Sequence, residues 1–293
     1  MDLLRTNTFK IVGKLVSQNL KTGNRKDNGA GFISGKAVVV SNLGGKDCEF
    51  EVSFFANQST QNGKDNQLYV SYSKMSELVG KKVEITGDIR ENRFYSARTS
   101  EMVSAQQLNG RFIRGVAETS ADEGSFEVGG FVVESLKEKR NKNNEVYRYD
   151  LALGQSNYSG TNMSRLVFHI NPSDVEIVKG VSAYQVGQTV SVYGDLRFYV
   201  ETITTEKANE GGFGAPVVRT YVNRQHNYFI TGGTAAIVAA DKGMYPSDII
   251  RNLVSAYKAR DVELSSKAKE SGAESAAVVK EEPKVSFRQT SLI

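Results

Sequence analysis

The sequence has few of the residues on which most catalytic and metal-binding sites depend. Cys48 is the only cysteine, and His169 and His226 are the only histidines in 293 residues. One cysteine excludes an intrachain disulfide and a cysteine cage for a metal, and it favours a reducing compartment. Each histidine stands alone in a strand-like segment, where a packed or solvated role is the commoner one. We therefore expect no catalytic residues, no bound metal, no cofactor and no enzymatic activity.

Long apolar segments and phosphate-binding patterns are also missing. The sequence has no run of 18 apolar residues, so we predict no membrane span. Its first residues lack the basic and then apolar order of a signal peptide, and we expect a cytoplasmic protein. The pattern G-x-x-x-x-G-K-[ST] does not occur. Gly211–Gly214 is not followed by a basic residue and a helix start, so we interpret it as a flexible flap.

Charge is distributed unevenly along the chain, whose formal net charge is +4. Residues 1–116 hold 17 basic and 11 acidic side chains, whereas residues 117–236 hold 11 basic and 14 acidic ones. The summed charge of a protein surface steers its partners, so a polyanion is expected to meet the first of these segments.

Part of the sequence occurs twice. The segment Val79–Arg90 recurs as Val186–Arg197, with the shared pattern Val-Gly-x-x-Val-x-x-x-Gly-Asp-x-Arg. Phe9-x-x-x-Gly13 recurs as Phe126-x-x-x-Gly130. Offsets of 107 and 117 residues are too long for a solenoid repeat and fit two whole domains. We predict a first domain at 1–116, a second at 117–236, a helical segment at 237–264 and a flexible tail at 265–293.

Most of residues 7–236 consists of short runs of β-branched and aromatic residues bounded by Gly, Asn and Asp, which predicts strands. Each half gives five strands with a connection between the third and fourth, at Ser73–Val79 and at Asn171–Tyr184. This order is typical of the OB-fold, a partly open Greek-key barrel that often binds oligonucleotides. The predicted fold class is mainly β, with two tandem OB-fold-like five-stranded barrels, a short C-terminal helix and a disordered tail.

Several local features are predicted within this frame. We expect the fifth strands near Arg93–Ala97 and Phe198–Thr204. Gly87-Asp88 and Gly194-Asp195 are expected to end strands in turns, because Gly-Asp is a common turn pair. Apolar residues at helical spacing predict a helix over about 247–260.

Basic and aromatic residues lie close together in both halves. Proteins that bind single strands need cations for phosphates and flat rings for bases, and stacking contributes about 1–3 kcal/mol per base. In the first half, the candidates are Lys21, Arg25 and Lys26 in the predicted loop Lys21–Gly31, followed by Arg90, Arg93, Tyr95, Arg98 and Arg111. In the second half, they are Lys137, Lys139 and Arg140 in the predicted loop Lys137–Asn144, followed by Tyr147, Arg148, Tyr149, Arg197, Tyr199 and Arg224.

An aromatic residue in a strand belongs to the core more often than to a base-stacking surface. Neighbouring residues of a strand point to opposite faces. At most one residue of the pair Phe94 and Tyr95, and one of the pair Phe54 and Phe55, is therefore buried in a barrel. The basic loops and the aromatic clusters fall where an OB-fold has its binding cleft, which favours the nucleic-acid interpretation.

With its paired Val-Gly-x-x-Val-x-x-x-Gly-Asp-x-Arg segments and basic first loops, the sequence resembles the phage-type single-stranded DNA-binding proteins, which have tandem OB-folds and a flexible tail. The resemblance covers residues 7–236. It implies that the chain coats single-stranded DNA without sequence preference in replication, recombination or repair, in the host cytoplasm if a phage encodes it. It also implies phosphate contacts by Lys21, Lys26, Arg93 and Arg98 and stacking by Tyr95, Tyr147 and Tyr199.

The end of the chain departs from related bacterial proteins, whose tails carry an acidic tip that recruits replication proteins. Residues 265–293 hold five basic and four acidic side chains. We still expect the C-terminal helix or tail to contact replication or recombination proteins, or to support an oligomer. Two alternatives stay open at this point. One is a structural protein of a virion or replisome scaffold without nucleic-acid binding, and the other is an RNA-binding protein.

Overall fold

The computed structural model describes residues 3–26, 29–96, 99–207, 217–238 and 242–278. The predicted flap Gly211–Gly214 and the residue Arg98 lie outside the described residues. Barrel one contains β1 (Asn7–Gln18), β2 (Lys21–Asn24), β3 (Gly31–Leu43), β4 (Lys46–Asn57), α1 (Gln67–Ser73), the 3-10 helix η1 (Met75–Leu78), β5 (Lys82–Ser96) and β6 (Glu101–Gly115). Barrel two contains β7 (Glu123–Arg140), β8 (Val146–Ser156), β9 (Met163–Ile170), α2 (Val175–Ser182), β10 (Thr189–Lys207) and β11 (Val217–Gly233).

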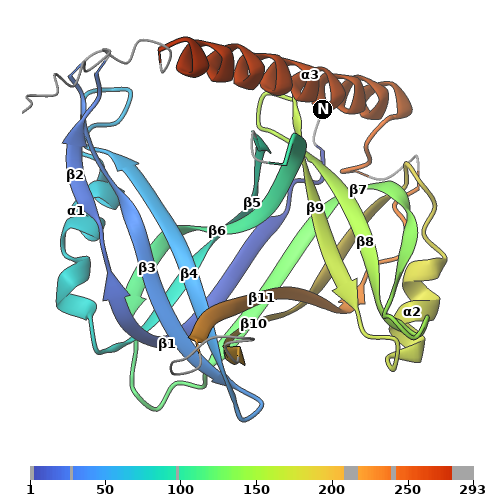
Figure 1. The fold of residues 1–293 in the computed structure, drawn as a ribbon, viewed down its shortest axis with the longest axis horizontal. Coiled ribbons are helices and arrows are strands. Elements are labelled where there is room, and N and C mark those ends of the chain that lie inside the picture. Colours follow the sequence, from blue (N-terminus) through green and yellow to red (C-terminus); the bar gives the residue numbers. More distant parts are fainter. Residues whose placement is uncertain (1–2, 27–28, 97–98, 208–216, 239–241, 279–293) are drawn as a thin grey trace, which may run out of the picture.

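Both halves close in the same way. In barrel one, β1 pairs antiparallel with β3 and β5, and the parallel pair β4–β6 closes the barrel at Val52↔Leu108. In barrel two, β7 pairs antiparallel with β8 and β10, and the parallel pair β9–β11 closes the barrel at His169↔Phe229. With the short strand β2 left aside, each half has five strands with a helix between the third and fourth, which is the OB-fold. The prediction of a mainly β fold with two tandem OB-like barrels is confirmed (Figure 1).

The first strands of the two barrels join them into one sheet. The described strands form a single eleven-stranded sheet in which β1 pairs antiparallel with β7. Phe9 lies opposite Phe126, its own counterpart in the repeat. An antiparallel pair in which a residue faces its own repeat copy has an approximate two-fold axis through that position. The chain therefore arranges its two barrels as a symmetric dimer would, within one polypeptide.

One hydrophobic core runs through both barrels. A continuous cluster of buried side chains extends from Phe9 and Phe50 of barrel one to Phe168 and Phe198 of barrel two. The rings of Phe50 on β4 and Phe198 on β10 pack with their centroids 5.2 Å apart. The two barrels therefore share buried apolar contacts.

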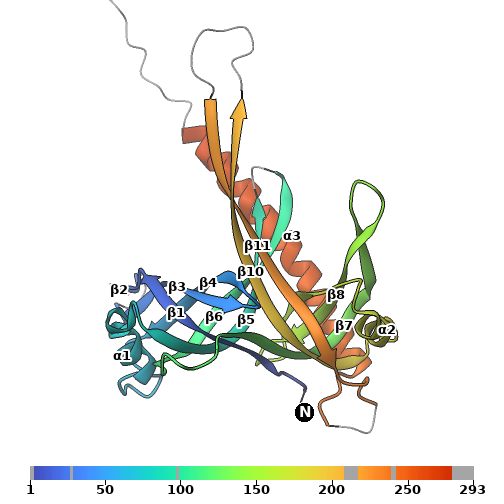
Figure 2. The same cartoon turned by 90° about the horizontal axis from the view of Figure 1, so that it is seen from below.

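Each barrel sends a hairpin arm across to the other. The first arm, residues 91–96 of β5 and 101–106 of β6, reaches β9. There the side chains of Glu91 and Gln106 accept hydrogen bonds from the backbone N–H groups of Arg165 and Val167 at 2.8 and 2.5 Å. The second arm, residues 197–207 of β10 and 217–226 of β11, reaches β4, where Arg224 lies 3.6 Å from Glu49. Figure 2 shows this second arm projecting well beyond the barrels.

These arms correct the prediction of the fifth strands. Arg93–Ser96 and Phe198–Thr204 belong to β5 and β10, and the fifth strands are β6 and β11. Ala97 lies outside the described residues. Gly87-Asp88 does not form a turn, because β5 continues through a bulge between Thr86 and Gly87. A Cβ atom on Gly87 would lie 2.0 Å from the carbonyl oxygen of Asn109. Close backbone approach at the bulge therefore requires this glycine, and Gly194 has the same role in β10.

Two further boundaries differ from the prediction. The first basic loop contains the short strand β2, which pairs with β3, and Lys137 to Arg140 belong to β7. Helix α3 runs from Ser247 to Val278, so residues 265–278 continue a helix where we predicted the start of a flexible tail. This stretch is rich in alanine, lysine and glutamate, which favour helix without giving an apolar stripe. In Figure 1, α3 runs past the ends of β5 and β9, two strands that it contacts.

Candidate nucleic-acid interface

The outer side of barrel one carries an exposed aromatic and basic surface. Residues of β4 alternate, with Cys48, Phe50, Val52 and Phe54 buried and Phe55 pointing outward, 48% exposed. An OB-fold binds oligonucleotides on the outer side of its second and third strands, which here are β3 and β4. We call this surface the open face, and it comprises Arg25, Phe32, Lys36, Phe55 and Arg111.

Two phenylalanines form a ring pair at one end of the open face. The rings of Phe32 on β3 and Phe55 on β4 are stacked with centroids 5.9 Å apart and planes 27° apart. The guanidinium carbon of Arg25 lies 5.9 Å from the Phe55 centroid. Arg25 also donates a hydrogen bond of 3.0 Å to Asn57. A flat apolar surface beside a cation is the arrangement that a stacked base and its phosphate require.

Other cations lie on neighbouring parts of barrel one. Lys21 and Lys26 are exposed and form no ion pair with any described residue. Lys36, farther along β3, pairs with Glu51 at 2.6 Å. Strands β4 and β6 run parallel, with Ser53 opposite Asn109. Two residues farther along each strand are Phe55 and Arg111. The register therefore places Arg111 on the strand next to Phe55.

A buried carboxylate positions Arg111 and Arg90. Asp88 accepts hydrogen bonds from Arg90 at 2.6 Å and from Asn109 and Arg111 at 2.9 Å each. Burial alone would raise the pKa of Asp88, but these three donors hold it below its ordinary value. The side chains of Arg90 and Arg111 remain 61% and 58% exposed. Asp88 therefore holds both guanidinium groups in place, and both remain accessible to a further anion.

The corresponding side of barrel two has its charges paired internally. We call the outer side of β8 and β9 the covered face, and it comprises Arg148, Asp150, Arg165, Val167 and His169. Asp150 lies 2.8 Å from Arg148, 3.9 Å from Lys139 and 3.0 Å from Nδ1 of His169. Although burial opposes ionisation, the hydrogen bond from His169 and the charge of Arg148 lower the pKa of Asp150. Asp150 therefore already pairs with the basic side chains around it.

The other cations predicted in barrel two are paired as well. Glu134 forms ion pairs with Lys137 and Arg165, and Arg140 pairs with Glu138 at 2.5 Å. Arg197 pairs with Asp195 at 2.8 Å, and Arg224 belongs to the second arm, near Glu49. The barrel therefore offers few free cations among its described residues, in agreement with its net negative charge in the sequence.

The predicted tyrosines differ in exposure. Tyr149 and Tyr199 are partly buried and pack against the core, so a core role accounts for both rings. Lys46 lies 5.7 Å from the ring of Tyr199. Tyr147 is 54% exposed, with the guanidinium carbon of Arg148 5.7 Å from its ring. Tyr95 lies half-buried on the first arm, opposite Met102.

Sequence reasoning missed the aromatic pair of the open face. Phe32 directly follows the basic loop, and alternation requires one of Phe54 and Phe55 to point outward. These two signals identify each ring as a candidate. Their stacking depends on the pairing of Ser34 with Phe55, which sequence alone does not give.

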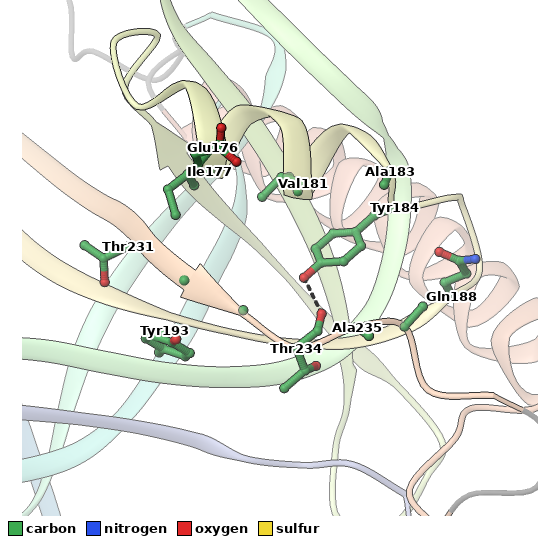
Figure 3. A pocket seen from close by; sticks show the side chains of 14 residues that line it. Glu176, Ile177, Val181, Ala183, Tyr184, Gln188, Tyr193, Thr231, Thr234 and Ala235 are labelled. Carbon is green, nitrogen blue, oxygen red and sulfur yellow. Dashed lines mark hydrogen bonds between the residues drawn. The ribbon is translucent and has the colours of Figure 1, made fainter.

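A cavity elsewhere on barrel two has a different character. It lies between α2 and the ends of β10 and β11 and has a volume of about 580 Å³. Tyr184, Tyr193 and residues 231–236 are among those that line it (Figure 3). The Tyr184 hydroxyl donates a 2.6 Å hydrogen bond to the Thr234 carbonyl. Glu176 is the only charged residue among those lining it. The cavity therefore lacks cations that would attract a phosphate.

The described residues also lack a metal-binding cluster and a membrane-spanning helix. They contain no group of three or more His, Cys, Asp or Glu side chains placed to hold a metal ion. No helix within them is both long enough and apolar enough to cross a membrane.

The fold defines this chain as a tandem OB-fold protein with its two barrels joined through their first strands. A model of the YorF family matches residues 5–270. The chain therefore belongs to the YorF family. No curated protein matches the sequence.

Solved structures with a similar fold include the wild-type single-stranded DNA-binding protein from Thermus aquaticus. The sequence identity is 10% and the TM-score 0.51, with 81% of this chain and 96% of that chain covered. A deletion mutant of the Thermus aquaticus protein gives 11% identity and a TM-score of 0.49, with 84% and 98% covered. At such low identity, the similarity to the wild-type protein shows a shared fold.

Proposed function

We propose that this protein binds single-stranded DNA without sequence preference and coats it during replication or recombination, without catalysing a reaction. The observation that carries this proposal is the stacked pair Phe32 and Phe55 beside Arg25, on the side of the barrel that OB-folds use for oligonucleotides. Every base has a flat face, so binding by stacking tolerates any sequence. The Thermus aquaticus neighbour, named as a single-stranded DNA-binding protein, supports the proposal through its shared fold.

Barrel one is the principal contact in this proposal. Lys21, Arg25 and Lys26 near the aromatic pair, with Arg90 and Arg111 beyond it, contact the phosphates. Barrel two extends or orients the strand and contributes less affinity, because its cations are paired with Asp150, Glu134 and Glu138. Arg93 is not a primary phosphate contact, because carboxylates of the chain already surround it.

The test is fluorescence anisotropy of a labelled oligo-dT at low and moderate salt, with duplex DNA and an RNA oligomer as competitors. We expect tight binding that weakens as salt rises, because bound cations displace the counterions of the strand. Duplex DNA should compete poorly, since its bases are not available for stacking. Effective competition by the RNA oligomer would instead assign the face to RNA. Absence of binding at low salt would contradict the proposal and favour a structural role.

A further inference from the structure

Helix α3 packs on the second barrel beside the covered face. Its residues Leu253 and Tyr257 are buried in a small apolar cluster with Phe131 of β7 and Met163 of β9. Met163 lies two residues before Arg165 on β9, so the helix covers this end of the face. Tyr245, which precedes the helix, packs on Phe131 with ring centroids 5.1 Å apart.

A polar cluster ties the same helix to the first arm. Arg93 donates hydrogen bonds to both carboxylate oxygens of Asp261 at 2.5 Å, and its guanidinium carbon lies 4.2 Å from the ring centroid of Tyr257. The Tyr257 hydroxyl accepts a hydrogen bond from Arg93 and donates one of 2.6 Å to Glu91. We call Glu91, Arg93, Tyr257 and Asp261 the latch cluster. The latch cluster therefore holds α3 against the first arm, which in turn contacts β9.

The latch cluster is nearly closed to solvent. The side chains of Glu91 and Arg93 are 3% and 14% exposed, and that of Asp261 is 25% exposed. Burial disfavours the charged form of Arg93, but its contacts with Asp261, Tyr257 and Glu91 raise its pKa. A charged arginine at this depth requires anionic partners, and Asp261 and Glu91 supply them. A phosphate group has the same charge sign and the same two-oxygen geometry toward arginine as this carboxylate.

The approximate two-fold symmetry shows what α3 adds. The outer side of β3 and β4 meets the second arm at Glu49, and the first arm contacts the backbone of β9 at the edge of the covered face. Phe55 on the first of these faces is 48% exposed, whereas the Met163 end of the second lies under α3. The helix follows the second barrel and has no counterpart after the first. The repeated fold alone would make the two faces alike, and α3 makes them different.

We propose that α3 is a latch over a second strand-binding face, and that a long single strand displaces it by taking Arg93 from Asp261. This inference rests on the proposed function, because it concerns the regulation of the same kind of site. A short strand occupies the open face and leaves α3 in place. A longer strand reaches Arg93, Arg148 and Arg165 once the helix leaves, so the number of nucleotides covered by one protein depends on the state of the latch.

The test compares two variants of the full-length protein that remove the same charge from the same helix. Asp261→Asn breaks the charge pair with Arg93 and keeps nearly the same side-chain shape. Glu263→Gln is the matched control, because Glu263 pairs with Lys267 on the exposed side of α3, outside the latch cluster. Hydrogen exchange of residues 250–261 reports whether the helix is held. Titration of poly(dT) reports the number of nucleotides occluded per protein.

We expect Asp261→Asn to accelerate hydrogen exchange in α3 and to increase the occluded length by roughly 4–16 nucleotides, the range covered by one OB-fold. Glu263→Gln should match the wild type in both measurements. In the wild type, a long oligo-dT should accelerate exchange in α3, and one too short to leave the open face should not.

Three results would overturn the latch while the proposed function stands. The first is strand binding with unchanged exchange in Asp261→Asn, because the cluster would then not hold the helix. The second is faster exchange with an unchanged occluded length. The third is the same change in Glu263→Gln, which would indicate a general effect of helix charge. Loss of the proposed function is distinguishable, because no variant and no wild-type sample would then bind dT.

Discussion

The two barrels share one topology but differ in what their outer faces offer. The open face of barrel one presents the stacked Phe32 and Phe55 with Arg25, and the exposed Lys21 and Lys26 lack ion pairs with described residues. The covered face of barrel two pairs Arg148 and His169 with Asp150 and lies partly under α3. A repeated fold therefore does not imply a repeated function, because affinity depends on the side chains at the face.

Both barrels contain the motif Gly-Asp-x-Arg, but its aspartate has different surroundings in each. Asp88 has a side chain 9% exposed and accepts from two arginines and Asn109, whereas Asp195 is 40% exposed and pairs with Arg197 alone. The same residue thus positions two exposed arginines in barrel one and one half-buried arginine in barrel two. The motif serves the bulge in both barrels and the candidate interface mainly in the first.

The prediction with the largest expected effect tests whether the two barrels unfold independently. Phe198→Ala should destabilise the protein by about 3–5 kcal/mol, because the buried ring packs against Phe50 of the other barrel. Chemical denaturation should show one transition for both barrels, in the wild type and in the variant. Phe112→Ala, at a ring 65% exposed, is the control and should change stability little. Two transitions, with only the second barrel weakened, would show independent domains.

Replacing the two motif aspartates should sharpen the contrast in packing. Asp88→Asn should cost roughly 1.5–3 kcal/mol, the range for hydrogen bonds to charged groups. Asp195→Asn should cost about 0–1 kcal/mol, as for exposed ion pairs. Urea denaturation of each variant at neutral pH measures both values.

The cost of Asp88→Asn should depend on pH. The folded-state pKa of Asp88 lies below its ordinary value, so its stabilisation is complete above that value and is lost as pH falls through the folded-state pKa. Wild type and Asp88→Asn should therefore converge in stability under strongly acidic conditions. A difference that stays constant down to the acid limit would mean that the carboxylate charge is not what stabilises this cluster.

Removing one ring of the aromatic pair should weaken strand binding. Phe55→Ala is expected to cost about 1–3 kcal/mol in oligo-dT binding, the contribution of one stacked base. Tyr158→Ala removes a ring that is 94% exposed between β8 and β9 of barrel two, and it should leave affinity unchanged. Anisotropy titrations with a short oligo-dT compare the two. Equal losses in both variants would remove the open face from the proposal.

The smallest effect concerns charge. Lys21→Gln combined with Arg25→Gln should reduce the slope of log affinity against log salt by about 1.4, at about 0.7 for each single-strand phosphate contact. Lys179→Gln, on the exposed side of α2, is the control for a general change in net charge. A slope that stays unchanged in the double variant would place the phosphates elsewhere.

The repeat made the two barrels predictable, because each copy carries the same glycines, apolar alternation and helical connection. The fifth strands were not predictable, because a Gly-Asp pair occurs in turns and in bulges alike, and a turn at Gly87-Asp88 would have ended the fourth strand there. The close approach of Asn109 to Gly87, which sequence does not show, selects the bulge. Charge counts indicated that barrel one is the more basic. They could not reveal that Arg93 contacts Asp261, because 168 residues separate the two in sequence. The face that α3 covers is likewise set by long-range packing.

Ultraviolet crosslinking of a short oligo-dT, followed by mass spectrometry of the crosslinked peptides, tests the inequality of the two faces most directly. We predict adducts in residues 21–57, at Phe32 or Phe55, and none in residues 146–170 of the covered face. Adducts mainly at Tyr147 or Tyr149, with residues 21–57 unmodified, would contradict the assignment of barrel one as the principal contact.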